Sequence, residues 1–108
     1  MSTAIYVSYY QKDPKTGEPC NFDVDYYLNT HMQLVQKHWG PHGMKSWTVI
    51  QFEENDPSGL HIQCIMHWES KEHFEKCFAL GIPEVHEDLK HYTNGMPVRY
   101  TGKVLLNG

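Results

Sequence analysis

The sequence lacks the features that mark several large classes of protein. No run approaches the roughly 20 apolar residues that a membrane-spanning helix needs. The first residues contain no basic region followed by an apolar one, so secretion is not signalled. The 13 acidic residues outnumber the 9 basic ones, which gives a formal charge of -4. This balance excludes the positive surface that nucleic acids and anionic membranes attract, and we expect a cytoplasmic protein with neither partner.

Cysteine is scarce, and the common motifs of cofactor chemistry are missing. The three cysteines, Cys20, Cys64 and Cys77, form no CxxC pair, which is typical of reduced thiols in a cytosol rather than of a disulfide framework. The sequence contains no P-loop, no GxGxxG, GxSxG or HExxH motif, and no Cys/His finger. We therefore predict no metal site and no cofactor.

Turn clusters divide the chain into short elements, and we expect a single domain over residues 1–108. Runs of β-branched and aromatic residues predict strands over residues 4–10, 44–53, 60–68 and 98–106. Helical spacing predicts a long helix over residues 23–39, a second over 71–80, and a short one that begins near Pro83. The order β-α-β-β-α-α-β is that of an α+β, ferredoxin-like βαββαβ fold with an extra short helix and an antiparallel four-stranded sheet.

The predicted strands are apolar on both faces. In the first strand, the positions of one face alternate with those of the other, and both sets are mostly apolar: Ile5, Val7 and Tyr9 against Ala4, Tyr6 and Tyr10. Two short helices cover only one face of such a sheet, and a large apolar patch left exposed usually marks an interface. We therefore predict a homodimer through the sheet faces. The alternative is that aromatic residues on an exposed face merely suit β-structure.

A histidine interrupts the apolar stripe of the long predicted helix. His31 is spaced at helical intervals from Tyr27, Leu34 and Val35, so its imidazole is expected on the side that meets the core. A histidine in such a place is more often structural than catalytic. Burial would keep it neutral at pH 7 and leave one nitrogen able to accept a proton. That property suits proton abstraction next to a carbonyl or phenol.

The residues around this histidine resemble a known family. The chain is similar to the EthD family, named for ethyl tert-butyl ether degradation, in the segments FDVDYYLNTHMQLVQKHWG, MKSWTVIQF, IQCIMHWES with KEHFEKCF, and HEDLKHYTNG. The similarity runs from about residue 5 to residue 104. Its most specific part is the aromatic pair Tyr26 and Tyr27 ahead of His31. Family members commonly have a proline two residues after the histidine, where this chain has Gln33.

The resemblance implies a dimeric α/β barrel, in which the sheets of two subunits join and the helices lie outside. It also implies a pocket inside each subunit, between the sheet and its helices, with His31 pointing toward it. The superfamily includes cofactor-free quinol-type monooxygenases, heme-degrading monooxygenases, lactone isomerases, polyketide cyclases, dehydratases and decarboxylases, together with proteins that have no assigned activity. Fold alone does not choose among these activities.

We accordingly predict a small cofactor-free enzyme that acts on a hydrophobic aromatic or carbonyl compound. His31 is the predicted general base, and its neighbour Tyr27 either assists it or fills core space. The predicted substrate pocket contains Tyr9, Trp47, His67 and His86. Two alternatives stay open: a non-catalytic small-molecule-binding or accessory protein of a degradation pathway, and a heme-binding protein similar to the heme-degrading monooxygenases.

Overall fold

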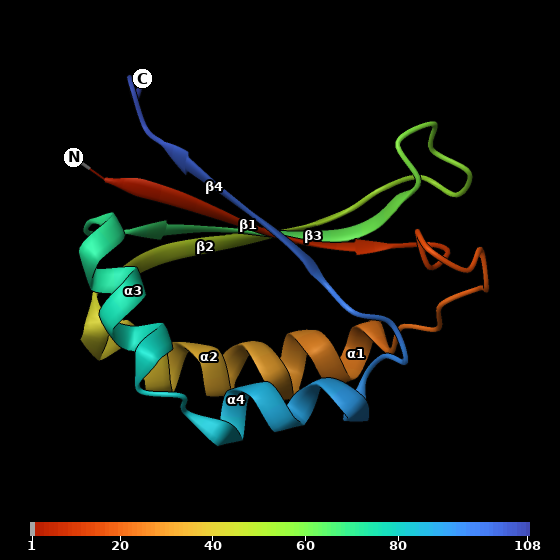
Figure 1. The fold of residues 1–108 in the computed structure, drawn as a ribbon, viewed down its shortest axis with the longest axis horizontal. Helices are drawn as coiled ribbons and strands as arrows, with labels where there is room; N and C mark the ends of the chain where they lie inside the picture. Colours follow the sequence, from red (N-terminus) through yellow and green to blue (C-terminus); the bar gives the residue numbers. More distant parts are fainter. Residues whose placement is uncertain (1) are drawn as a thin grey trace.

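Two layers make up the structure, a four-stranded sheet and a group of helical segments that lie on one of its faces (Figure 1). The computed structural model describes residues 2–108. The strand pairs are antiparallel. The strand order is β2-β3-β1-β4, formed by β1 (Thr3–Tyr10), β2 (Met44–Gln51), β3 (Leu60–Trp68) and β4 (Val98–Lys103). The predicted α+β, ferredoxin-like fold is thereby confirmed.

The helical layer consists of a long first stretch, a separate helix and a short final stretch. The first stretch comprises α1 (Val24–Tyr26), the π-helical segment η1 (Tyr27–His31), α2 (Met32–Trp39) and the 3-10 segment η2 (Gly40–His42). The separate helix is α3 (Lys71–Ala79). The final stretch is α4 (Pro83–Glu87), which continues into the 3-10 segment η3 (Asp88–His91). The predicted long helix is therefore present, but a π-helical turn lies within it.

Side-chain capping fixes where two of the helices begin. The Asp23 carboxylate accepts a hydrogen bond from the backbone N–H of Tyr26 at 3.0 Å, and the Ser70 hydroxyl accepts one from the N–H of His73 at 3.1 Å. Each cap satisfies a backbone donor that the first turn of a helix leaves without a partner.

Strand β4 ends earlier than the sequence predicts, at Lys103 rather than at residue 106. Its one neighbour is β1, and the pairing ends where Thr3 meets Lys103. Leu105 and Leu106 lie beyond that point and are 80% and 90% exposed. Their apolar character favoured a strand, but a strand needs a partner for its backbone hydrogen bonds. Strand β2 likewise ends at Gln51 rather than at residue 53.

The two faces of the sheet differ in what covers them. Alternate residues of β3 are buried against the helical layer, namely Ile62, Cys64, Met66 and Trp68. The opposite side is here called the outer face, and none of the helices in residues 2–108 covers it (Figure 1). One row of cross-strand neighbours on the outer face runs across the whole sheet, from Thr48 through Ile65 and Tyr6 to Tyr100. The predicted second apolar face is thus present and uncovered within this subunit.

Gly43 offers a test of how closely α3 packs on the turn between η2 and β2. It has a φ angle of 113°, and a Cβ placed there would lie 2.9 Å from the Cβ of His73. We expect Gly43→Ala to lower the free energy of unfolding by about 2–4 kcal/mol, because backbone strain and a close contact add. Gly17→Ala is the control, because φ at Gly17 is 76° but a Cβ placed there would have no neighbouring atom within 4 Å. Strain alone acts there and costs about 1–2 kcal/mol. Urea unfolding measures both losses, and equal losses would contradict the close contact.

Candidate active site

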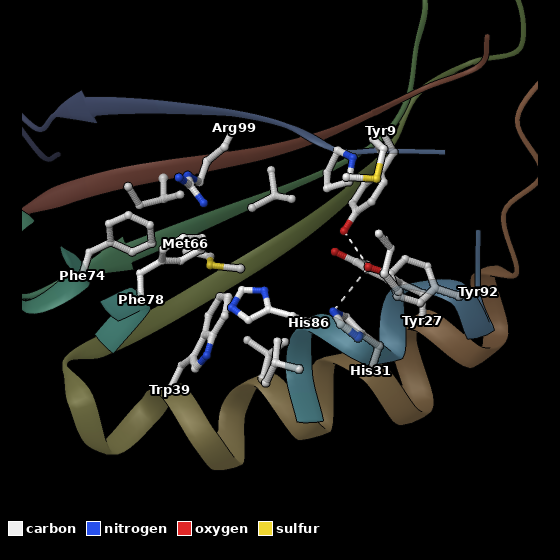
Figure 2. Close-up of a pocket in the computed structure, with 17 residues that line it drawn as sticks. Tyr9, Tyr27, His31, Trp39, Met66, Phe74, Phe78, His86, Tyr92 and Arg99 are labelled. Atoms are coloured by element: carbon white, nitrogen blue, oxygen red, sulfur yellow. Dashed lines mark hydrogen bonds between the residues drawn. The ribbon is translucent and has the colours of Figure 1, made fainter. Parts of the chain in front are cut away.

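A cavity of about 340 Å³ lies between the inner face of the sheet and the helices (Figure 2). Its volume falls in the lower part of the range for small-molecule pockets, roughly 300–1,000 Å³. Aliphatic, aromatic and methionine side chains form most of its wall. The lining residues with polar side-chain groups number seven, and they are Tyr9, Tyr27, His31, Trp39, His86, Tyr92 and Arg99. The cavity therefore suits an apolar molecule with a few polar atoms.

The π-helical segment η1 positions the two predicted catalytic residues. Its buried residues are Tyr27 and His31, and the backbone N–H of Met32 bonds to the carbonyl of Tyr27, five residues back. A π-helical turn inside an α-helix frequently occurs at functional sites. The rings of Tyr27 and His31 stack, with centroids 5.3 Å apart and an interplanar angle of 18°. Tyr27 therefore packs against one face of the imidazole.

A buried carboxylate orients the imidazole. His31 Nδ1 lies 3.0 Å from Asp88 Oδ2, and both side chains are 8% exposed. The other carboxylate oxygen, Oδ1, accepts a hydrogen bond of 2.6 Å from the Tyr26 hydroxyl. Because a carboxylate only accepts hydrogen bonds, Nδ1 carries the ring proton and donates a hydrogen bond to Asp88. Nε2 then keeps its lone pair in the neutral imidazole.

Two tyrosine hydroxyls continue the polar chain beyond Nε2. Tyr92 Oη lies 3.5 Å from His31 Nε2 and 2.7 Å from Tyr9 Oη. Figure 2 shows these three side chains at one end of the cavity. Tyr9 comes from β1 and Tyr92 follows η3, so the sheet and the final helical stretch meet at this point. The arrangement connects a nitrogen lone pair to two hydroxyl protons.

Burial sets the protonation states of these groups. It lowers the pKa of His31 below its usual 6.5, although the hydrogen bond and the charge of Asp88 act in the opposite direction. Burial also raises the pKa of Tyr9 to about 12, and it raises the pKa of Tyr92 well above its ordinary value. At neutral pH the imidazole is therefore neutral and both phenols keep their protons. The site combines one base with two hydroxyl donors.

The structure brings four of the six predicted site residues to the cavity wall: Tyr9, Tyr27, His31 and His86. Trp47 and His67 do not line it. Trp47 lies on β2, at the opposite edge of the sheet from β4, where its Nε1 donates a hydrogen bond to Gln36. His67 falls between two inward-pointing residues of β3, so alternation places it on the outer face. The prediction that Trp47 and His67 line the pocket is therefore wrong.

Sequence reasoning missed Asp88 and Tyr92, two polar groups next to His31. Both lie on the buried stripe of the final helical stretch, and that stripe consists of Val85, Asp88, Leu89 and Tyr92 at helical spacing. A carboxylate on an apolar stripe is the same signal that singled out His31. It could therefore have identified Asp88, although it could not have shown which residue Asp88 meets.

Neither a metal site nor a reactive cysteine is supported by the part of the chain that the structure describes. Among residues 2–108, no three side chains of His, Cys, Asp or Glu are arranged to hold a metal ion. Cys64 and Cys77 are free and buried, and burial raises the pKa of the Cys64 thiol to about 12. Both therefore pack as unreactive thiols. No helix within this part of the chain is long and apolar enough to cross a membrane.

Solved structures share this fold over nearly the whole chain. An EthD-like protein from Ralstonia eutropha JMP134 superposes with a TM-score of 0.79 at 22% sequence identity, covering 99% of this chain and 95% of that chain. The chain has the fold of EthD-like proteins. The predicted resemblance to this family is thus confirmed at the level of the fold.

Two further structures bear on chemistry and assembly. SnoaB, a cofactor-independent oxygenase from Streptomyces nogalater, has a TM-score of 0.61 at 11% identity, with 98% of this chain and 94% of that chain covered. A dimeric ferredoxin-like protein from an uncultured marine organism has a TM-score of 0.52 at 12% identity, with 99% and 96% covered. No protein-family model matches the chain, and a search of curated proteins found no significant match.

Removing the charge of Asp88 tests its effect on His31. In the Asp88→Asn variant the carboxylate no longer raises the pKa of His31, so we expect that pKa to fall further below 6.5. Titration of the imidazole protons by NMR measures the shift. The exposed neighbour Glu87 provides the control variant Glu87→Gln. An unchanged or higher pKa in Asp88→Asn would contradict the pairing.

The lowered pKa of His31 also predicts how stability depends on pH. Between pH 6.5 and the lower pKa of the folded state, the unfolded chain protonates this residue while the folded protein keeps it neutral. The stability that neutral His31 contributes is therefore fully present above pH 6.5 and is lost as the pH falls through the folded pKa. In urea unfolding, the wild type should lose stability on acidification more steeply than His31→Gln. Parallel curves for the two proteins would show that His31 is not the group responsible.

Proposed function

We propose that the protein is an EthD-like enzyme, one domain over residues 1–108, that removes a proton from a hydrophobic aromatic or carbonyl compound. The observation that carries this proposal is the pairing of His31 with Asp88 in the wall of an apolar cavity. A neutral imidazole with a fixed tautomer is a suitable general base near pH 7. The buried carboxylate stabilises the imidazolium that forms when Nε2 takes up a proton.

Proton uptake reverses the hydrogen bond between His31 and Tyr92. Neutral Nε2 accepts a hydrogen bond, whereas protonated Nε2 donates one. The Tyr92 oxygen, 3.5 Å away, then becomes the acceptor. The O–H of Tyr92 is then free to donate a hydrogen bond to the developing anion of the substrate. The Tyr9 hydroxyl, 2.7 Å from that of Tyr92, holds the Tyr92 hydroxyl in place. One base and one donor thus act in the same step.

The chemistry that follows depends on the enolate or phenolate that remains. Such an anion isomerises, loses a leaving group or reacts with O2 without a metal. The shared fold with SnoaB, described as a cofactor-independent oxygenase, supports a reaction of this kind. A cavity of about 340 Å³ favours a compound of one or two rings over a molecule as large as heme.

The base is tested with a panel of phenols, quinols, enolisable ketones and lactones. Turnover is followed by O2 uptake, by product formation and by exchange of acidic C–H for solvent deuterium. We expect His31→Gln to lower kcat/KM by about 10²–10⁴, with ligand binding retained. The control is His42→Gln, which alters an exposed histidine on η2. Exchange and turnover that survive in His31→Gln would contradict the role of this base. Binding without turnover in both proteins would favour the accessory alternative.

We also propose that two subunits associate through their outer faces. Aromatic and aliphatic residues on this face have no cover within the subunit, and Ile50 and Tyr100 are 37% and 50% exposed. A second copy would bury the row that includes Ile65 and Tyr6, and closed two-fold pairing is the commonest solution for such a surface. A structure with this fold that is described as dimeric supports the assignment.

Sedimentation at micromolar concentration tests the dimer. The wild type should sediment at twice the subunit mass of 12.6 kDa. Ile65→Glu places a charge in the centre of the outer face and should give the single-subunit mass, because burying an unpaired charge costs several kcal/mol. Leu80→Glu is the control, since Leu80 is 60% exposed but follows α3 in the helical layer. A wild type that sediments as a monomer would overturn the proposal.

A further inference from the structure

The cavity has a second polar end, which the proposed proton transfer does not use. Arg99, the only arginine in the sequence, lines the cavity from β4. Its guanidinium carbon lies 4.2 Å from the centre of the Phe78 ring and 5.3 Å from that of Phe74. Aromatic rings at this distance attract the guanidinium electrostatically, and the guanidinium carries five N–H donors. Arg99 is therefore positioned without having its hydrogen-bond donors occupied by these rings.

No acidic residue neutralises Arg99. None of its nitrogen atoms forms an ion pair with a carboxylate of residues 2–108. The residues that line the cavity include Arg99, His86 and His31 but no Asp or Glu. The chain as a whole carries a formal charge of -4. A cavity without acidic groups in an acidic protein is suited to an anion.

The cationic end and the basic end lie apart. Figure 2 shows Arg99 beside Phe78, while the hydroxyls of Tyr9 and Tyr92 lie with His31 at the other end. The ring centroid of His86 lies 6.0 Å from that of Trp39 and 5.1 Å from that of Phe78. The rest of the lining is mainly apolar and includes Val7, Met66, Val85 and Leu89. A ligand that fills the cavity therefore contacts the Arg99 guanidinium, apolar side chains and the His31 imidazole.

We propose that the cavity takes an aromatic carboxylate, whose carboxylate pairs with Arg99 while its ring carries the acidic proton to His31. The guanidinium edge matches a planar carboxylate and can bind both of its oxygens. A dianionic phosphate is less suited, because Arg99 is the one permanent cation in the wall. The aromatic body would cover the guanidinium from water and so strengthen the ion pair. The inference rests on the proposed function only for the role of His31.

Calorimetric titration with matched ligand pairs tests this assignment. The pairs are 6-hydroxy-2-naphthoate with 2-naphthol, and 4-hydroxybenzoate with phenol, so that each pair differs by one carboxylate. We expect at least one carboxylate to bind the wild type about tenfold tighter than its neutral partner. That advantage should shrink as salt is added. Arg99→Met keeps an apolar chain against Phe78 and should abolish the advantage, whereas Arg99→Lys should keep part of it.

Two controls separate this inference from the proposed function. Lys103→Met removes a charge from the same strand outside the cavity and should leave the advantage unchanged. His31→Gln should also retain it, because the base is not needed to hold the carboxylate. Circular dichroism establishes that each variant is folded. If His31→Gln keeps turnover while the tighter binding of the carboxylate still depends on Arg99, the proposed base is wrong and the anion site stands.

The opposite results overturn the anion site. These are equal binding of the carboxylate and its neutral partner in both pairs, an advantage that persists in Arg99→Met, or no binding of either carboxylate at millimolar concentration. Each of them is compatible with a His31-dependent reaction on neutral compounds, so the proposed function is judged by its own assay.

Discussion

A single buried carboxylate joins the two ends of the helical layer, and the candidate site depends on this contact. Asp88 accepts hydrogen bonds from Tyr26 at 2.6 Å and from His31 at 3.0 Å. These partners belong to the first helical stretch, while Asp88 belongs to the last. A buried charge that loses its partner costs several kcal/mol, so the two stretches are held together by the need to satisfy it. The same contact fixes the tautomer of the base.

The cavity owes its chemistry to local surroundings rather than to the average charge of the chain. Its wall is apolar, and the burial that this wall causes lowers the pKa of His31 and raises those of Tyr9 and Tyr92. The site therefore has a base and donors in their useful forms at neutral pH. Arg99 adds a positive charge at the other end, in a protein whose formal charge is -4. Shape, protonation and charge together define what can bind.

Most of the fold could be predicted because short-range rules control it. Alternation along β3 puts Cys64 and Met66 on the same face, and Asp23 and Ser70 begin helices by accepting hydrogen bonds from residues three positions away. The end of β4 could not be predicted in this way. It depends on where β1 begins, at the opposite end of the chain, since an apolar segment becomes a strand only beside a partner.

The sequence by itself determined the order of elements, the apolar character of both sheet faces and the burial of His31, because each follows from spacing within a few residues. Only the tertiary structure decided that Asp88, 57 positions away, is the partner of His31, and that Tyr92 lies beside its free nitrogen. It also decided that Trp47 lies at the far edge of the sheet from the cavity. These facts depend on how the two layers pack, and spacing along the chain does not specify which buried residues meet across that interface.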